Sequence, residues 1–162
     1  MTSHKILVIN SGSSSIKYRL FNVRTDRRHN NSHYGLISKG LIEKIGQKDS
    51  GVENHKQGIQ MLLDSMVHGS QARLKNYDEI FAIGHRVVHG GVTFKKPSLI
   101  TDEIIAKIRE CIELAPLHNP ANLQGIRAAQ ATFPDVPHVA VFDTAFHQTL
   151  APAAFTYAID AG

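Results

Sequence analysis

Cysteine is nearly absent from this sequence, and its scarcity excludes several kinds of site. Cys111 is the single cysteine among 162 residues, so an intrachain disulfide is impossible. Zinc sites built on cysteine need several thiolates, and we therefore expect none. A lone thiol within an apolar helical pattern is usually a packing residue, and we expect Cys111 to be buried on a helix.

Long hydrophobic runs are missing as well. The first apolar run, Ile6–Ile9, is much shorter than a signal-peptide core or a membrane span requires. We therefore expect a cytoplasmic protein with no membrane partner. Hydrophobic residues make up 42% of the chain and charged residues 20%, so a folded globular domain is expected rather than a disordered chain.

Charge is not concentrated in a way that suits nucleic acid. The formal net charge is +4, but lysine and arginine are scattered, apart from Arg24, Arg27 and Arg28. These three residues lie in a polar stretch with no aromatic platform beside them on which bases could stack. A mildly basic surface can instead attract anionic substrates, and we expect no nucleic-acid partner.

Hydrophobic periodicity predicts an α/β fold, with one mixed sheet and flanking helices. Strands are expected at Lys5–Asn10, at Ser15–Val23, within Tyr34–Ile45, at Glu79–Val88 and at His138–Phe142. Helices are expected at His55–Val67, after Thr101 as N-cap, and up to Thr132 after Asn119 as N-cap. The expected order is β-β-β-α-β-α-α-β, in which the first two strands form a hairpin.

The first chemical motif is Asn10–Lys17, a serine-rich turn directly after a buried strand. Gly12 permits a turn that a side chain would resist, and consecutive backbone N–H groups there can surround an anion. A period of two from Ser13 onward would place Ser13, Ser15 and Lys17 on one face, as polyphosphate binding needs. A strand rather than a helix follows, so this is no Walker A loop. The alternative is a serine-rich β-turn beside a solvated lysine.

The second motif is Gly84–Gly91, in which a buried strand ends in an arginine, a histidine and two glycines. Arg86 and Val88 share a face, so a guanidinium would lie beside a small apolar pocket. The guanidinium fork matches a carboxylate or phosphate with two parallel hydrogen bonds. The alternative is an arginine in a structural ion pair.

The third motif is Leu114–Asn122, a tight connection between two expected helices. It places His118 at a helix N-terminus, where the helix dipole favours anions. A proline-rich turn in which Asn119 only caps the helix is the alternative reading.

The fourth motif is Val139–Thr149, which follows a buried strand. It places Asp143 at the C-terminal end of that strand, where ligands of α/β sheets commonly bind. Asp143 could hold Mg²⁺ through water, or it could cap the following turn. His147, in the same stretch, is expected to be structural.

Together, and in this order, these four motifs resemble the acetate kinases and the closely similar propionate kinases. The resemblance runs from about Lys5 to Tyr157. It implies the ribonuclease-H-like fold of the superfamily of sugar kinases, heat-shock ATPases and actin, with two similar domains and nucleotide in the cleft between them. The implied activity is Mg²⁺-dependent, reversible phosphoryl transfer from ATP to acetate, giving acetyl phosphate and ADP.

By resemblance, the first motif would bind the nucleotide. Asn10 would ligate the Mg²⁺ that accompanies ATP. The residues that would contact the phosphates are Gly12, Ser13, Ser15 and Lys17.

The other motifs would form the substrate site, again by resemblance. Arg86 would bind the substrate carboxylate or its phosphate. Val88 and Leu117 would contact the acetate methyl group. His118 would lie beside the phosphoryl path, and Asp143 would be the catalytic aspartate.

The resemblance also predicts a domain organisation. Residues 1–150 would form the N-terminal ribonuclease-H-like kinase domain, and residues 151–162 would begin the crossover to a second domain. Full-length members of the family continue well past Gly162 and form homodimers. We therefore expect the 162 residues by themselves to lack full activity.

The expected mechanism depends on positioning and charge neutralisation more than on covalent help. A carboxylate nucleophile is already ionised at neutral pH, since its reference pKa is about 4. Asp143 should therefore organise Mg²⁺ or water rather than remove a proton, while Arg86 offsets charge on the transferring group. Two alternatives stay open, namely a propionate kinase and a phosphate- or nucleotide-binding module without catalysis.

Overall fold

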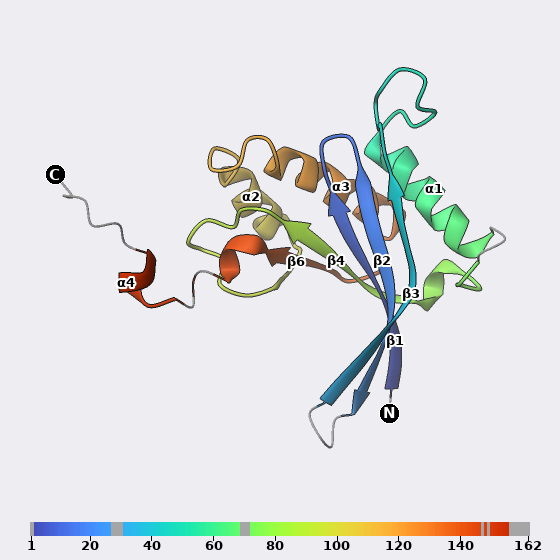
Figure 1. Cartoon of the computed structure of the whole chain (residues 1–162), viewed down its shortest axis with the longest axis horizontal. Helices are drawn as coiled ribbons and strands as arrows, with labels where there is room; N and C mark the ends of the chain where they lie inside the picture. The colour runs from blue at the N-terminus through green and yellow to red at the C-terminus, as the bar shows by residue number, and fades with distance from the viewer. Residues whose placement is uncertain (1, 27–30, 69–71, 147, 149, 156–162) are drawn as a thin grey trace.

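The structure is a computed structural model that describes residues 2–26, 31–68, 72–146, 148 and 150–155. Within these residues, a six-stranded sheet is packed against helices (Figure 1). Its strands are β1 (Thr2–Ser11), β2 (Ile16–Asp26), β3 (Asn31–Ile42), β4 (Ile80–Val87), β5 (Ser98–Leu99) and β6 (His138–Phe142). The helices are α1 (His55–Val67), α2 (Asp102–Glu110), α3 (Asn119–Thr132) and α4 (Pro152–Phe155), with short 3₁₀ segments at Tyr77–Glu79 and Asp143–Ala145.

The sheet is mixed, with the strand order β3-β2-β1-β4-β6-β5. β1, β2 and β3 form an antiparallel meander. β4 lies parallel beside β1, and β6 lies parallel beside β4. This α/β sheet and the order of its long elements confirm the fold class expected from the sequence. Only the edge strand β5 has no counterpart among the expected strands, because its two residues are too few to show an alternating pattern.

The three long helices all pack on the same face of the sheet. Leu7 and Ile9 of β1 are buried in a core shared with α1 and the C-terminal half of α3. Val87 of β4 and Phe142 of β6 are buried in a second core, to which Ile108 of α2 belongs. The N-terminal half of α3 contributes to this second core, so α3 supports both halves of the sheet.

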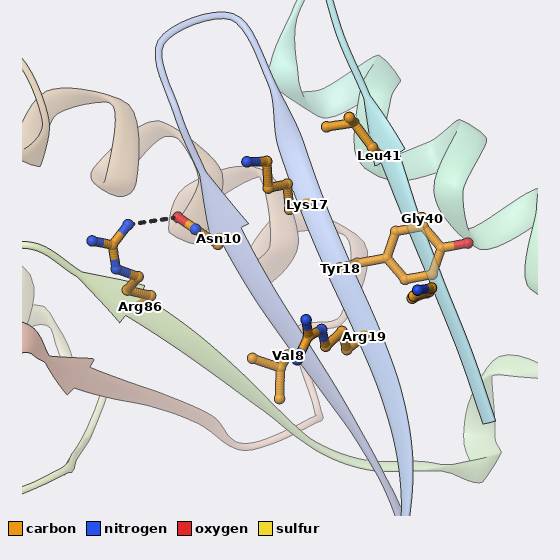
Figure 2. A pocket seen from close by; sticks show the side chains of 9 residues that line it. Val8, Asn10, Lys17, Tyr18, Arg19, Gly40, Leu41 and Arg86 are labelled. Atoms are coloured by element: carbon orange, nitrogen blue, oxygen red, sulfur yellow. Dashed lines mark hydrogen bonds between the residues drawn. The ribbon is translucent and has the colours of Figure 1, made fainter. Parts of the chain in front are cut away.

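The three long helices do not lie on the other face of the sheet, which carries the side chains drawn in Figure 2. The side chains that point toward it from β1, β2 and β4 include Val8, Asn10, Lys17, Arg19 and Arg86. The apolar Val8 is 36% exposed there, and the three cations are exposed around it. The open face is therefore basic and partly apolar.

One expected helix start is confirmed and another is wrong. Thr101 caps α2, because its Oγ1 accepts a hydrogen bond from the N–H of Ile104. Asn119 does not cap α3; it is the first helical residue, and His118 occupies the cap position without a side-chain hydrogen bond. The Asn119 side chain instead binds the backbone of His89, a partner distant in sequence.

A buried pair of histidines lies between β4 and β6 on the helix-covered face. Nε2 of His85 is 2.9 Å from Nδ1 of His138, and Nε2 of His138 is 3.0 Å from the Phe133 carbonyl oxygen. A carbonyl only accepts, so His138 donates through Nε2 and accepts at Nδ1 from His85. Burial, with His138 beside it, lowers the pKa of His85 to about 3, and burial also lowers the pKa of His138.

We expect the free energy of unfolding to fall as the pH drops below 6.5, the ordinary pKa of these histidines. The unfolded chain then binds protons that the folded chain excludes, so stability present above pH 6.5 is lost progressively toward pH 3. His85 should account for about 2 kcal/mol of loss between roughly pH 7.5 and 5. Urea unfolding at both pH values measures the effect.

The matched variants are His85→Gln and, at an exposed histidine of β3, His33→Gln. His85→Gln should have a weaker pH dependence than the wild type, although its stability at neutral pH is lower. His33→Gln should follow the wild type. An unaltered pH dependence in His85→Gln would show that His85 is not kept neutral by the fold.

Candidate functional site

The connection between β1 and β2 is a tight turn with one hydrogen bond inside the turn and one contact to helix α1. The N–H of Gly12 donates to the carbonyl of Ser15 at 2.8 Å. Nε2 of His55, the first residue of α1, lies 2.8 Å from the Gly12 carbonyl oxygen. These two contacts fix the turn relative to the helix layer.

The common face expected for Ser13, Ser15 and Lys17 does not arise from strand alternation. β2 begins only at Ile16, so both serines belong to the turn and Lys17 alone follows the period of two. Ser13 is exposed, whereas Ser15 is half-buried and its Oγ would lie 3.1 Å from a Cβ placed on Gly12. Gly12 therefore allows this close approach and does not supply a positive φ.

Lys17, Asn10 and Arg86 form a row across the open face. Asn10 pairs with Lys17 in the β1–β2 ladder, and the β1–β4 ladder ends with Ile9 beside His85. The next residues along these parallel strands, Asn10 and Arg86, are therefore neighbours (Figure 2). Lys17 is exposed and has no acidic partner among the described residues.

A hollow of about 550 Å³ opens over this row. Cationic and apolar side chains line it together, namely those of Val8, Asn10, Lys17, Tyr18, Arg19, Lys39, Leu41 and Arg86, beside Gly40. Among the described residues, no carboxylate belongs to this lining, and Asp143 approaches only the far side of Arg86. An anion would meet several positive charges here and little competing negative charge.

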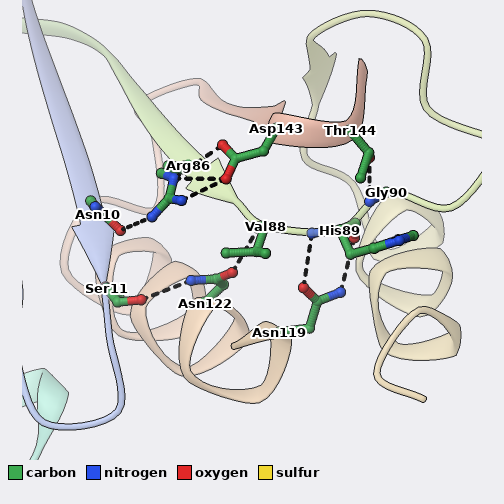
Figure 3. A network of polar contacts seen from close by, with 10 residues as sticks. All are labelled: Asn10, Ser11, Arg86, Val88, His89, Gly90, Asn119, Asn122, Asp143 and Thr144. Carbon is green, nitrogen blue, oxygen red and sulfur yellow. Dashed lines mark hydrogen bonds and ion pairs between the residues drawn. The ribbon is translucent and has the colours of Figure 1, made fainter. Parts of the chain in front are cut away.

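The guanidinium of Arg86 is held between β6 and β1 (Figure 3). Its Nε donates to both carboxylate oxygens of Asp143 at 3.0 Å, and its Nη2 donates to Oδ2 at 2.6 Å. Its Nη1 donates to Oδ1 of Asn10 at 3.4 Å. Asp143 follows β6 directly, and its carboxylate accepts hydrogen bonds from Arg86. It is the first residue of the 3₁₀ segment and does not cap it.

This arrangement leaves part of the guanidinium available to a ligand. A guanidinium has five N–H donors, of which Asp143 takes one from Nε and one from Nη2, while Asn10 takes one from Nη1. One N–H therefore remains on each terminal nitrogen, and the outer edge between Nη1 and Nη2 is not taken by Asp143. That edge can bind a carboxylate or phosphate bidentately, and the Arg86 side chain is 47% exposed.

Three further predicted residues lie beyond the end of β4 and before α3. Val88 directly follows β4 and is half-buried, and its N–H is bound by Asn122 of α3. Leu117 and His118 directly precede α3, and both are exposed, Leu117 to 80%. Among the described residues, the His118 ring makes no hydrogen bond with the Arg86 group.

The described residues include only part of the fourth motif and of the expected crossover. His147 and Thr149 lie outside the described residues, as do residues 156–162. Among the described residues of the site, hydrogen bonds join Arg86 directly to Asn10 and Asp143.

The oxygens of Asn10 and Asp143 can contribute to a metal site without forming one alone. In the described part of the chain, no group of three or more His, Cys, Asp or Glu residues could hold a metal ion. Mg²⁺ is usually held by one or two carboxylates together with waters and substrate phosphates. One carboxylate and one amide oxygen beside a basic hollow fit an Mg²⁺ that arrives with a phosphate ligand.

Comparison with known proteins assigns this arrangement to a family. The sequence profile of the Acetokinase family matches residues 5–162. The chain belongs to the acetokinase family. It is 46% identical over 170 residues to an acetate kinase of Thermoanaerobacterium thermosaccharolyticum and 47% identical over 171 residues to one of Desulfitobacterium hafniense. These comparisons cover 96% of this chain but only 40% and 41% of the relatives.

Solved acetokinase structures share the fold. An acetate kinase of Porphyromonas gingivalis superposes with a TM-score of 0.81 at 37% identity, covering 96% of this chain and 41% of that one. A propionate kinase of Francisella tularensis gives 0.76 at 40% identity, covering 98% and 41%. The chain thus spans about two fifths of the length of its acetokinase relatives, as expected for the N-terminal domain of the family.

Sequence reasoning missed the polar side chains that shape this edge of the acetokinase sheet. Asn119 and Asn122 are buried and bind backbone groups at the ends of β1 and β4 (Figure 3). The hydroxyl of Thr144 accepts from the N–H of Gly90 at 3.0 Å. One sequence pattern could have indicated these asparagines. Their spacing of three residues puts both on one face of the helix, and since a helix needs only one N-cap, the second asparagine must have another role.

α3 approaches the end of β1 closely because Gly125 has no side chain. A Cβ on Gly125 would lie 1.9 Å from Oγ and 2.4 Å from Cβ of Ser11. In the described part of the chain, Ser11 Oγ is a buried side-chain polar atom without a hydrogen-bond partner. The space beside Gly125 is thus filled by the Ser11 side chain.

We expect Gly125→Ala to destabilise the fold by about 1–3 kcal/mol, since overpacking of this kind forces α3 away from β1. This loss of stability is expected even though helix propensity favours alanine over glycine by roughly 1 kcal/mol. Gly35→Ala is the control, because nothing lies within 4 Å of a Cβ at that exposed position of β3. Urea unfolding compares the two variants; a Gly125→Ala chain as stable as the wild type would show that α3 can shift at little cost.

Proposed function

We propose that this chain carries the carboxylate- and phosphate-binding part of an acetate kinase, which transfers a phosphoryl group reversibly between ATP and acetate with Mg²⁺. The observation that carries the proposal is the Arg86 guanidinium. Asp143 and Asn10 hold it in place, while its outer edge faces a basic hollow. Relatives over 45% identical bear the name acetate kinase, which supports the choice of acetate.

In the proposed reaction, the acetate carboxylate attacks the terminal phosphorus of ATP, a P–O bond to acetate forms and the bond to ADP breaks. The carboxylate is ionised at neutral pH, so no general base is required. Arg86 would hold first the carboxylate and then the phosphoryl oxygens, while Asp143 keeps the guanidinium oriented. Lys17 and the turn at 12–15 would contact the nucleotide phosphates.

The remaining site residues have narrower proposed roles. Asn10 and Asp143 would offer oxygens to the Mg²⁺ of the nucleotide, which neutralises phosphate charge when bound. Val88 and Leu117 would contact the acetate methyl group. His118 would lie beside the phosphoryl path, where the N-terminus of α3 favours negative charge.

The larger organisation is part of the same proposal. Residues 1–150 would be the first ribonuclease-H-like domain of a longer, cytoplasmic, homodimeric enzyme, and residues 151–162 would begin the crossover to its second domain. The fraction of the relatives that this chain covers supports that organisation. In the part of the chain that the structure describes, no helix is long and apolar enough to cross a membrane.

Propionate kinase is the second candidate function. The Francisella structure of that name is 40% identical, slightly more than the Porphyromonas acetate kinase at 37%. The two activities share the carboxylate and phosphate chemistry of Arg86 and differ by one methylene of substrate. A hydrophobic pocket discriminates one methylene by only about 10–200-fold, so both acids have to be assayed.

Arg86→Ala should weaken the binding of inorganic phosphate to the chain by about 10-fold or more, since hydrogen bonds to charged groups contribute about 1.5–3 kcal/mol. Arg86→Lys should not restore it, because an ammonium cannot offer two parallel donors. Arg127→Ala, which removes an exposed cation of α3, is the control for net charge. Phosphate titration followed by ³¹P NMR measures the affinities.

Stability should not explain that loss. Arg86 and Asp143 are 47% and 42% exposed, and ion pairs of this exposure stabilise a fold by roughly 1 kcal/mol or less. The urea midpoints of the three variants should therefore stay close to that of the wild type. Wild-type phosphate affinity in Arg86→Ala would remove Arg86 from the site.

A polypeptide limited to these 162 residues should form acetyl phosphate about 10³-fold or more slowly than a full-length acetate kinase. In-line transfer requires nucleotide and carboxylate to be held together, and loss of a single transition-state arginine can have an effect of this size. Hydroxylamine trapping with ATP, Mg²⁺ and either acetate or propionate measures both rates. A rate comparable to that of a full-length enzyme would mean that the described groups suffice for catalysis.

A further inference from the structure

The first turn of α3 contains two buried asparagines whose side chains bind only backbone. Asn119 is 0% exposed and Asn122 is 4% exposed. A buried amide that forms both a donor and an acceptor bond is stable, whereas an unsatisfied one is costly. Both residues therefore contribute to folding, but their partners differ.

Asn122 joins the ends of two parallel strands where their direct pairing stops. The β1–β4 ladder ends with Ile9 beside His85. Beyond it, Nδ2 of Asn122 donates to the carbonyl of Ser11 at 2.7 Å, and Oδ1 accepts from the N–H of Val88 at 3.1 Å (Figure 3). A planar side-chain amide thus replaces the next hydrogen bonds of the ladder and sets how far apart the strand ends lie.

These strand ends carry the groups that meet at the open face. Asn10 directly precedes Ser11, and Arg86 lies two residues before Val88. The Asn10 Oδ1 to Arg86 Nη1 distance of 3.4 Å is at the long limit of a hydrogen bond, so a small change in strand separation breaks it. We propose that Asn122 is a positioning residue for the anion site, because it sets the spacing of Asn10 and Arg86.

Asn119 is a natural control for this proposal. Its Oδ1 accepts from the N–H of His89 at 3.1 Å, and its Nδ2 donates to the carbonyl of the same residue at 2.9 Å. It lies on the same helix turn as Asn122, is buried to a similar degree and also binds backbone on both sides of its amide. Its Nδ2 also lies 3.5 Å from the carbonyl oxygen of Ile108 and 3.4 Å from that of Cys111, so its bonds involve α2 and the segment after β4, and none of them reaches β1.

The experiment compares four variants of the 162-residue chain, namely Asn122→Ala, Asn122→Asp, Asn119→Ala and Asn119→Asp. The aspartates are isosteric, and Asn122→Asp keeps the acceptor for Val88 while losing the donor to Ser11. Thermal melting reports stability. Two ¹⁵N NMR signals, the side-chain amide of Asn10 and Nε of Arg86, report the spacing, and titration with inorganic phosphate reports the anion site.

Both Asn122 variants should displace the two NMR signals and weaken phosphate binding by about 10-fold, the size of one hydrogen bond to a charged group, with alanine the more severe. The Asn119 variants should leave both signals in place and phosphate affinity within about 2-fold, although their melting temperatures fall comparably. If Asn122→Ala does not fold, the isosteric Asn122→Asp decides the comparison. A purely structural role predicts equal effects at both asparagines.

The inference rests on the proposed anion site for its binding readout only. A wild-type chain that binds no phosphate would sink the proposed function, whereas the NMR signals would still show whether Asn122 controls the Asn10–Arg86 spacing. Unchanged signals in the Asn122 variants would overturn the inference. Equal displacement in the Asn119 variants would overturn it as well.

Discussion

The pairing of β1 with β4 is the constraint on which the candidate site depends. Its register ends with Ile9 beside His85, so the next residues, Asn10 and Arg86, meet on the open face. β6 pairs along the other side of β4 and ends one residue before Asp143, which brings that carboxylate to the same guanidinium. Side chains 57 and 76 residues apart in sequence are thus assembled by backbone hydrogen bonds, and their own contacts complete the arrangement.

The fold was largely predictable because its long elements have clear periods. The alternation of Ile16, Lys17 and Leu20 in β2 reflects one buried and one exposed face, and that difference is visible in the sequence. The cap expected at Asn119 was wrong, because Asn followed by Pro is also the usual start of a helix. Its true partner, the backbone of His89, is 30 residues away and leaves no local signal. The turn itself was expected, but the period of two was wrong at Ser13 and Ser15, because β2 begins only at Ile16.

Candidate site residues could be named from the sequence, whereas their geometry could not be predicted. The motifs around Arg86 and Asp143 name chemical groups, and the family resemblance supplies their proposed roles. No pattern in the chain says that Asp143 occupies one edge of the guanidinium and leaves the other free. The roles of Gly125 and Asn122 could not be predicted, because both residues contact Ser11, which is more than 100 residues earlier in the sequence.

The hydrogen bond from Asn122 to Ser11 also has a consequence for the order in which the chain acquires structure. It joins residues 111 apart, whereas β1, β2 and β3 pair with their neighbours in sequence. Closing short loops costs less chain entropy, so the meander can assemble while the ribosome is still making α3. The serine turn is then an early product of synthesis. The neighbourhood of Arg86 needs both α3 and β6, so the turn can form on a nascent chain before the guanidinium site is complete.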